Sequence, residues 1–496
     1  MADEERVARR QTPDETTTLL PTVNASDEYY PMTKTRAAVW AVLTLVFVTC
    51  LTILVAAPQI VPDFLAPAIG RLPKDPLRAA KLILDSAPII VRLSFCSKKF
   101  GAQPLRTATL VRLDGPSLAR AYLDIRSDLP ILLRELFSNN LTAVDLRKSG
   151  FPGHVDIPRL RKGKVGGFFW STYVDCANPD EEGPDFLNST WRVRDTLEQI
   201  DVAKLAIEQY SDVRALSADL SLLMRSQVFQ FATSSADIRA SVANGKIASL
   251  LGIEGGHQLG LSIAVLRQYF RLGVRYLTLT HTCHNAFADS CGYAPGKEPL
   301  HGGLSPLGLR LIDEMNRLGM LVDLSHVADD TAKQALQHSR APVIWSHSSA
   351  RAVHNVPRNV PDDVLAFVGD REGQTDAVVM VNFAPQFVAD EGKADVAAVA
   401  DHVDHIAKVA GKKHVGIGSD YDGIGSTPNG LEDVSKYPYL FAELYRRGWN
   451  KHELTGLAGA NLLRIFEGAE QVARELQAAR DTPSVRCLRQ AHRPVD

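Results

Sequence analysis

The 496-residue chain has few cysteines and no excess of charge of either sign. Six cysteines in this length are too sparse for the disulfide framework of a small secreted scaffold. Lys and Arg (55) nearly balance Asp and Glu (57), which excludes the basic excess typical of a nucleic-acid-binding protein. No short internal repeat is evident, which argues against a solenoid. With 45% hydrophobic residues, the composition is that of a globular protein with two or three domains, or one large α/β barrel.

An uncharged stretch near the N-terminus has the length of a membrane-spanning helix. As a helix, residues 37–57 would extend about 31 Å, close to the thickness of the hydrocarbon core. The stretch is longer than the apolar region of a cleaved signal peptide and lies far from the first residue, so we expect an uncleaved signal anchor rather than a buried helix. Lys34 and Arg36 flank its start, and the positive-inside rule places the N-terminus in the cytoplasm.

This orientation predicts a single-pass type II membrane protein whose main part is lumenal or extracellular. Asn140 and Asn188 lie in glycosylation sequences on that side, whereas the matching Asn24 is cytoplasmic. The destination stays open between a vacuolar or endosomal membrane and the cell surface. The predicted parts are a disordered cytoplasmic tail (1–36), the transmembrane anchor (37–57), a stalk (58–77), a main domain (78–475) and a C-terminal tail (476–496).

The main domain alternates short apolar runs with amphipathic stretches. The amphipathic stretches include 262–273, 306–319 and 329–339. Strand followed by helix, repeated, predicts a parallel sheet, and continuously apolar strands are typical of a sheet covered on both faces. We therefore expect the α/β class and a (β/α)8 TIM-like barrel, preceded by the single transmembrane helix. The expected strands lie within 165–174, 247–256, 274–281, 319–326, 341–347, 377–383 and 414–422.

Acidic or imidazole side chains lie at the ends of several of these apolar runs. They are Glu254, His281, His326, His347 and Asp420. Each histidine taken alone is better explained as a core residue, but the ends of barrel strands carry the chemistry, and the set as a whole points to a site. Imidazole and carboxylate ligands without thiolate favour Zn²⁺. A carboxylate such as Glu254 can bridge two ions, which together make a shared hydroxide nucleophilic.

The main domain contains six longer motifs. They are LGIEGGH (251–257), RYLTLTHTCHN (275–285), LVDLSH (321–326), APVIWSHSSARAV (341–353), RNVPDD (358–363) and GSDYDGIGSTPNGLEDVSKYP (418–438). Together these motifs resemble those of the membrane (renal) dipeptidase family, and the resemblance extends from about Asp128 to Glu470. It implies an amidohydrolase-like barrel of the metal-dependent hydrolase type, which cleaves a dipeptide to two amino acids through a metal-bound hydroxide.

The resemblance also implies the metal ligands. Two zinc ions are expected, with Asp128 at the first site and Glu254 as the bridge between them. His326 and His347 complete the second site. All four side chains are of the types that bind zinc.

Further roles follow from the same resemblance. His281 contacts the substrate and helps to stabilise the tetrahedral intermediate, and Arg358 binds the terminal carboxylate of the dipeptide with its guanidinium. Asp420 transfers the proton between the attacking water and the leaving amine. Cys176 and Cys283 match positions that form a disulfide in the family. Whether the protein is a homodimer stays open.

One family motif is interrupted in this chain. The family has Asp-Gly-His-x-Asp-Leu-Pro at its first strand, whereas residues 124–130 read Asp-Ile-Arg-Ser-Asp-Leu-Pro. Arg126 therefore stands in place of the ligand histidine, and a guanidinium offers no lone pair to a metal. Residues 91–127 are either retained non-coding sequence that is foreign to the mature protein, or part of a natural variant with an impaired first zinc site.

We therefore expect a zinc-dependent dipeptidase. The alternatives are an enzyme that hydrolyses another amide, such as a β-lactam-like ring, and a membrane-anchored pseudoenzyme that binds peptides without turnover. Arg126 is the residue that favours the pseudoenzyme. Zinc content distinguishes the enzyme from the pseudoenzyme. About two zinc ions per chain would favour the enzyme, because a dinuclear enzyme needs both ions, and close to none would favour the pseudoenzyme.

Overall fold

The computed structural model of the protein describes residues 33–56, 72–93, 129–176, 191–211, 227–292, 298–479 and 483. Several residues singled out from the sequence lie outside the described residues, namely Asn24, Arg126, Asp128 and Asn188. The chain divides into two compact units, Met1–Ile69 and Gly70–Asp496.

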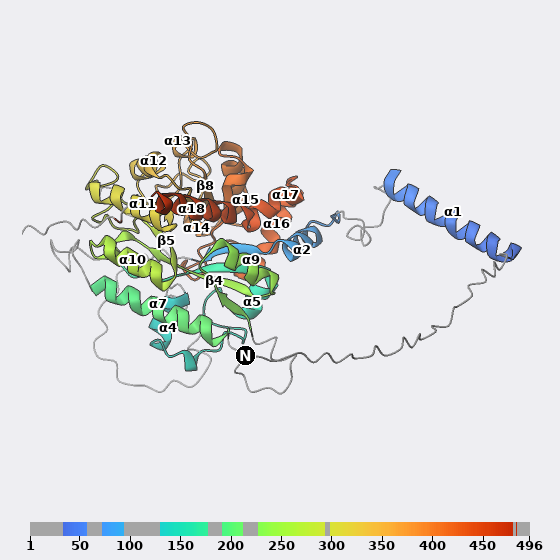
Figure 1. The fold of residues 1–496 in the computed structure, drawn as a ribbon, viewed down its shortest axis with the longest axis horizontal. Helices are drawn as coiled ribbons and strands as arrows, with labels where there is room; N and C mark the ends of the chain where they lie inside the picture. The colour runs from blue at the N-terminus through green and yellow to red at the C-terminus, as the bar shows by residue number, and fades with distance from the viewer. Residues whose placement is uncertain are drawn as a thin grey trace, which may run out of the picture. The chain divides into compact units, whose positions relative to one another are not determined.

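The N-terminal unit contains one described helix, α1 (Lys34–Ala56), drawn in blue in Figure 1. It covers nearly all of the predicted anchor at 37–57, and large apolar side chains such as Trp40 and Phe47 are exposed on it. Within the described part of the chain, however, none of the helices has both the length and the apolar character of a membrane span. The anchor therefore stays a prediction.

In the described part of the C-terminal unit, nine parallel strands form one sheet. The order is β1-β2-β4-β5-β6-β7-β8-β9, and β3 pairs with the first residues of β4. Because β1 and β9 are also in contact, the eight-stranded path nearly closes into a barrel. The strands are β1 (Ile89–Leu93), β2 (Val165–Ser171), β3 (Phe229–Phe231), β4 (Ile247–Glu254), β5 (Val274–Thr278), β6 (Leu321–Asp323), β7 (Val343–Trp345), β8 (Ala377–Val381) and β9 (Val415–Ile417).

Helices connect the strands and surround the sheet (Figure 1). They are α2 (Pro76–Ser86), α4 (Leu129–Phe137), α5 (Ile157–Lys162), α7 (Trp191–Gln209), α9 (Ser235–Ala243), α10 (Ile263–Leu272), α11 (Pro306–Leu318), α12 (Asp329–His338), α13 (Asp362–Leu365), α14 (Pro385–Val388), α15 (Val396–Val409), α16 (Tyr437–Arg446), α17 (Lys451–Thr455) and α18 (Asn461–Ala478). Short 3₁₀ turns lie at Leu141–Ala143, Gly256–Leu259, Lys412–His414 and Val434–Lys436, and a π-helical turn at Gly456–Ala460.

Local sequence explains where these helices begin and end. The hydroxyl of Ser305 accepts a hydrogen bond from the amide of Gly308 at the start of α11, and Pro306 occupies the first turn. Gly319 ends the same helix with a φ of +77°, a conformation that glycine adopts without steric cost. This helix brings the chain back to the start of β6, as the amphipathic stretch 306–319 predicts.

One end of the barrel is closed by α18. Ala248 and Leu250 of β4 belong to a buried apolar cluster that also contains Ile465 and Phe466 of α18. Their neighbour Leu251 belongs to a different buried cluster, because successive side chains of a strand point to opposite faces. Asn461 of α18 donates a hydrogen bond to the carbonyl of Val415, the first residue of β9, so α18 lies at the amino-terminal ends of the strands. The carboxyl ends are therefore the ones available to form a site.

The TIM-like barrel predicted from the sequence is confirmed, and each of the seven expected apolar runs contains a strand. Two strands, β1 and β3, were not predicted. Val91, the first residue of the anomalous interval 91–127, pairs with Phe168 of β2, so β1 extends into that interval as far as Leu93. The rest of the interval lies outside the described residues.

Candidate metal and substrate site

Four of the predicted site residues meet at the carboxyl ends of neighbouring strands. Glu254 is the last residue of β4, and His281, His326 and His347 follow β5, β6 and β7. All four side chains are buried, at 2% exposure or less. The sheet order β4-β5-β6-β7 places these strand ends side by side.

The ligand atoms of three of these residues converge. Glu254 Oε1 lies 3.0 Å from His326 Nε2 and 3.1 Å from His347 Nε2, and the two Nε2 atoms are 2.9 Å apart. Two imidazole nitrogens this close share at most one proton, so at least one lone pair points into the cluster. Nitrogen, nitrogen and carboxylate oxygen form a donor set that suits zinc, so these residues fit the second site of the predicted pair.

His281 lies beside the same cluster. Its ring centroid is 4.4 Å from that of His326, and Glu254, His281 and His326 each offer one ligand atom within 4.8 Å of the others. The geometry therefore also allows His281 to act as a ligand, a role that the sequence did not assign to it. Asp128, the predicted ligand of the first site, lies outside the described residues.

A hydrogen-bond relay orients His347. Ser346 Oγ lies 2.9 Å from His347 Nδ1 and donates to the Asp323 carboxylate. Asp323 is fully buried and also accepts from the amide of Ser346 at 2.8 Å. The relay holds the imidazole with Nε2 toward Glu254. Asp323 and Ser346 were not identified from the sequence, although Asp323 lies three residues before His326.

The backbone of His326 adopts an unusual conformation. Its φ is +66°, a left-handed value that costs a non-glycine residue about 1 kcal/mol. The carbonyl of His326 accepts hydrogen bonds from Thr280 Oγ1 at 3.1 Å, Ser290 Oγ at 3.1 Å and the Cys291 amide at 2.8 Å. These three contacts offset the cost and hold the imidazole in place. Such strain is typical of functional sites.

Tyr173 and a disulfide hold His281 from the other side. The Tyr173 hydroxyl lies 3.4 Å from His281 Nδ1 and donates to Asp175 at 2.9 Å. Cys176 and Cys283 form the predicted disulfide, with Cα atoms 6.0 Å apart, and so join the loop after β2 to the loop after β5. His281 Nδ1 also lies 3.2 Å from Thr282 Oγ1, so two hydroxyl groups hold this side of the imidazole.

His257 lies close to the disulfide but is a packing residue. Its Nε2 donates to the carbonyl of Val174 at 2.8 Å, and burial lowers the pKa of His257 to about 3. The imidazole is therefore neutral. Both neighbouring sulfurs belong to the disulfide and cannot ligate a metal as thiolates.

Asp420 follows β9 and is fully buried, with a φ of +68°. Asn382, which follows β8, donates from Nδ2 to Asp420 Oδ2 at 2.9 Å. This bond holds one oxygen of the carboxylate in place. Asn382 was not identified from the sequence, because an amide after a strand carries no pattern that distinguishes it from a core polar residue.

Arg358 is 95% buried yet incompletely hydrogen-bonded. Its Nη1 donates to Ser348 Oγ at 2.7 Å, and the guanidinium lies 5.6 Å from the ring centroid of Phe387. Nε and Nη2 have no partner among the described residues. Since a buried donor without a partner is costly, this guanidinium has the properties of a site that receives an anion.

Comparisons with known proteins agree with this arrangement. A family model described as membrane dipeptidase (peptidase family M19) matches residues 119–480. An uncharacterised dipeptidase of Schizosaccharomyces pombe is 44% identical over 400 residues, which cover 79% of this chain and 91% of that protein. Dipeptidase aclJ of Aspergillus oryzae is 44% identical over 359 residues, which cover 71% and 79% of the two chains.

Solved structures also resemble this chain. A metallopeptidase of Rhodobacter sphaeroides, bound to a phosphinate mimic of the dipeptide L-Ala-D-Ala, matches with a TM-score of 0.56 and 25% identity over 69% of this chain and 97% of that one. The probable dipeptidase PvdM of Pseudomonas aeruginosa matches with a TM-score of 0.61 and 20% identity, over 81% and 100% of the two chains. At that identity, the second likeness supports the fold alone.

Proposed function

The chain belongs to the membrane dipeptidase family, and on this premise we propose that it hydrolyses dipeptides to free amino acids with zinc as its cofactor. The observation that carries the proposal is the convergence of Glu254 Oε1 with the Nε2 atoms of His326 and His347, each about 3 Å from the others. The incompletely bonded Arg358 supports a substrate that ends in a carboxylate.

Glu254, His326 and His347 would hold one zinc ion, and Asp128 with Glu254 would hold the other. A divalent ion bound by such ligands makes water nucleophilic near neutral pH and polarises a carbonyl. The relay through Asp323 and Ser346 keeps the second site preorganised.

The protein's own side chains would position the dipeptide and move its protons. Arg358 binds the terminal carboxylate and fixes the distance from there to the scissile bond, which limits the substrate to a short peptide. His281, held beside Tyr173, would donate a hydrogen bond to the carbonyl oxygen as negative charge develops there. Asp420 takes the proton of the attacking water and passes it to the leaving amine, while Asn382 holds its other oxygen.

The test is dipeptide turnover by the purified full-length chain, measured as released amino acids by mass spectrometry. We expect turnover that a chelator abolishes and added zinc restores. A β-lactam-like substrate, assayed beside the dipeptide, distinguishes a dipeptidase from an enzyme that hydrolyses another amide. Peptide binding without turnover, in a protein that contains close to no zinc, would instead favour the pseudoenzyme.

We further propose that the chain is a type II membrane protein. The uncharged stretch 37–57 and the flanking Lys34 and Arg36 support this orientation. Asn140 is exposed and accepts a hydrogen bond from Thr142 Oγ1 at 2.6 Å, so its glycosylation sequence is accessible. The test combines carbonate extraction of membranes with site mapping of glycans, and glycans on Asn24 would contradict the orientation.

A further inference from the structure

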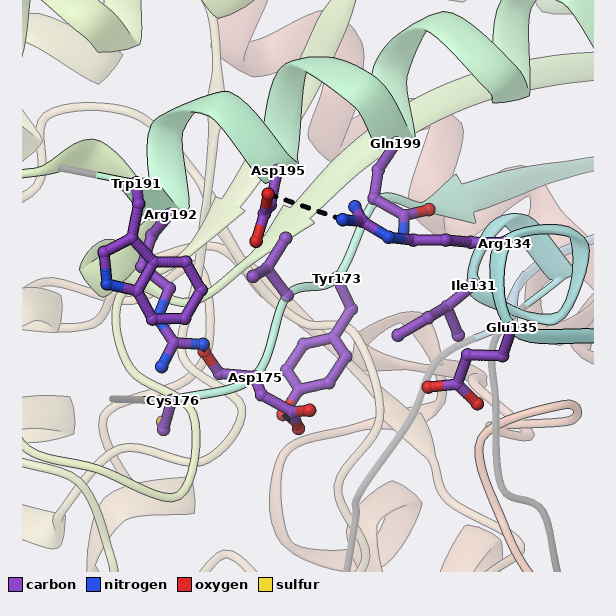
Figure 2. Close-up of a pocket in the computed structure, with 11 residues that line it drawn as sticks. Ile131, Arg134, Glu135, Tyr173, Asp175, Cys176, Trp191, Arg192, Asp195 and Gln199 are labelled. Carbon is purple, nitrogen blue, oxygen red and sulfur yellow. Dashed lines mark hydrogen bonds and ion pairs between the residues drawn. The ribbon is translucent and has the colours of Figure 1, made fainter. Parts of the chain in front are cut away.

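We propose that a cavity beside Tyr173 receives the side chain of the substrate's amino-terminal residue and favours a cationic one, such as lysine or arginine. This inference rests on the dipeptidase function proposed above. The cavity has a volume of about 280 Å³ and lies between the end of β2 and helices α4 and α7 (Figure 2). Four methylene groups and an ammonium fit into this volume. We call it the Tyr173 cavity.

The Tyr173 cavity adjoins the proposed reaction centre. The Tyr173 hydroxyl lies within 3.4 Å of His281 on one side and 2.9 Å of Asp175 on the other. Arg358 follows β7, whereas Tyr173 follows β2, and the ends of β4, β5 and β6 lie between them in the barrel. A dipeptide whose carboxylate is bound by Arg358 therefore extends its amino-terminal residue toward Tyr173.

Hydrogen-bond acceptors line the cavity. The carboxylates of Glu135 and Asp175 are exposed there, and neither forms an ion pair within the described part of the chain, although Asp175 accepts a hydrogen bond from the Tyr173 hydroxyl. Gln199 is 1% exposed, and its Oε1 has no hydrogen-bond partner there either. A buried acceptor of this kind is costly unless a ligand donates to it.

The cations of the cavity are already engaged. Arg134 pairs with Asp195 at 3.4 Å and with Glu198 at 3.1 Å, as Figure 2 shows for the first of these pairs. Arg192 donates to the carbonyl of Asp175 and lies 3.6 Å from the centroid of the Trp191 ring. Since the carboxylates of Glu135, Asp175 and Asp195 outnumber these two guanidinium groups in the lining of the cavity, the complementary ligand is a cation, such as an ammonium or guanidinium group.

Two further features match a long cationic side chain. Ile131 and the rings of Tyr173 and Trp191 line the cavity together with the carboxylates of Glu135 and Asp175 (Figure 2). The apolar groups would contact the methylene groups of the substrate side chain, and the carboxylates would contact its charged end. Burial raises the pKa of Glu135, and the neighbouring Asp175 carboxylate raises it further. A cation between the two carboxylates would relieve this repulsion.

The first experiment compares kcat/KM for Lys-Ala, norleucyl-Ala and Glu-Ala with the full-length, zinc-loaded protein. Norleucine has nearly the shape of lysine but lacks the ammonium. We expect Lys-Ala to exceed norleucyl-Ala by about tenfold and Glu-Ala to be the poorest substrate. Hydrolysis of all three at equal rates would overturn the cavity's selectivity and leave the dipeptidase function intact. No hydrolysis of any dipeptide would overturn both.

The second experiment assigns the preference to the cavity. Glu135→Gln and Asp175→Asn are each expected to lower the Lys-to-norleucine ratio of kcat/KM about threefold. Gln199→Leu should lower the ratio similarly without lowering Tm, because it removes a buried acceptor that has no protein partner. Glu208→Gln removes an equal charge from an exposed position on α7 and should leave the ratio unchanged. An unchanged ratio in both Glu135→Gln and Asp175→Asn would refute the inference.

Discussion

Glu254 Oε1 lies 3.1 Å from His347 Nε2, and neither side chain is exposed to solvent. The two residues come from strands β4 and β7, which are separated in the sheet by β5 and β6. A buried carboxylate is costly unless a cation or hydrogen bonds compensate it. The barrel therefore brings together a carboxylate and an imidazole from distant segments of the chain. A divalent ion bound by both groups would compensate the buried negative charge.

The first prediction concerns these ligands. His326→Ala and His347→Ala should each lose one zinc ion per chain and all detectable hydrolysis, because three protein ligands cannot be reduced to two without a large loss of affinity. Zinc is measured by plasma mass spectrometry after gel filtration. His452→Ala, an exposed histidine on α17, is the control and should keep both properties. Unchanged zinc in His347→Ala would show that this ligand is misassigned.

The second prediction concerns the relay behind His347. Ser346→Ala removes the hydroxyl that lies between Asp323 and His347 Nδ1, so the imidazole loses its fixed orientation. We expect zinc affinity to fall about 10- to 100-fold. A competition titration with a chromogenic chelator measures it. Ser262→Ala, at a hydroxyl without a hydrogen bond in the described residues, is the control. Equal affinities in the two variants would mean that the relay does not orient the ligand.

The positions of the site residues were largely predictable from the sequence. In a parallel barrel the carboxyl ends of strands share one edge, so a polar residue that ends an apolar run is expected there. Glu254, His281, His326, His347 and Asp420 all occupy such places in the structure. The disulfide between Cys176 and Cys283 was available only through the family resemblance, because spacing does not determine connectivity.

The supporting contacts were not predictable in the same way. Ser346 and Asn382 act through hydrogen bonds to residues from other strands, which depend on tertiary packing and leave no periodic pattern. The strand β3 has only three residues, too few to show alternation. The Tyr173 cavity is likewise formed by segments that meet only in the fold.

A third prediction tests the role of Arg358. Arg358→Met should raise KM for dipeptides with a free carboxylate about 10- to 100-fold, because a charged hydrogen bond contributes roughly 1.5–3 kcal/mol. The wild-type protein should therefore discriminate against the C-terminal amide of the same dipeptide, and the variant should not. Arg310→Met, at an exposed position on α11, serves as the control. Discrimination that survives in Arg358→Met would place carboxylate recognition elsewhere.

A fourth prediction concerns the closed end of the barrel. Phe466 of α18 is 1% exposed and packs in the interior cluster. Phe466→Ala should lower the free energy of unfolding by about 3–5 kcal/mol, since a large buried side chain is replaced by a cavity. Chemical denaturation measures the loss, with Arg474→Ala on the same helix as an exposed control. A change in stability no larger than that of the control would show that α18 contributes little to the core.

The last prediction concerns Arg126, which lies outside the described residues. The family motif has a histidine ligand at its position, and a guanidinium would instead place a positive charge near an ion of charge +2 in a pocket of low dielectric constant, where repulsion is poorly screened. The chain as written should therefore bind about one zinc ion at most and hydrolyse dipeptides weakly. The second zinc site should still bind its ion, because its ligands His326 and His347 lie outside the interrupted motif.

Two variants distinguish the ligand from the interval around it. Arg126→His restores the ligand type alone. A second version replaces residues 94–126 by Asp-Gly-His, which leaves β1 intact to Leu93 and leads directly into Ser127 and Asp128. If the interval is foreign to the mature protein, only the second version should bind two zinc ions and gain full turnover. If the chain is a natural variant, Arg126→His alone should gain the second ion. Two zinc ions and full activity in the unaltered chain would refute both explanations, because neither allows a complete first site beside Arg126.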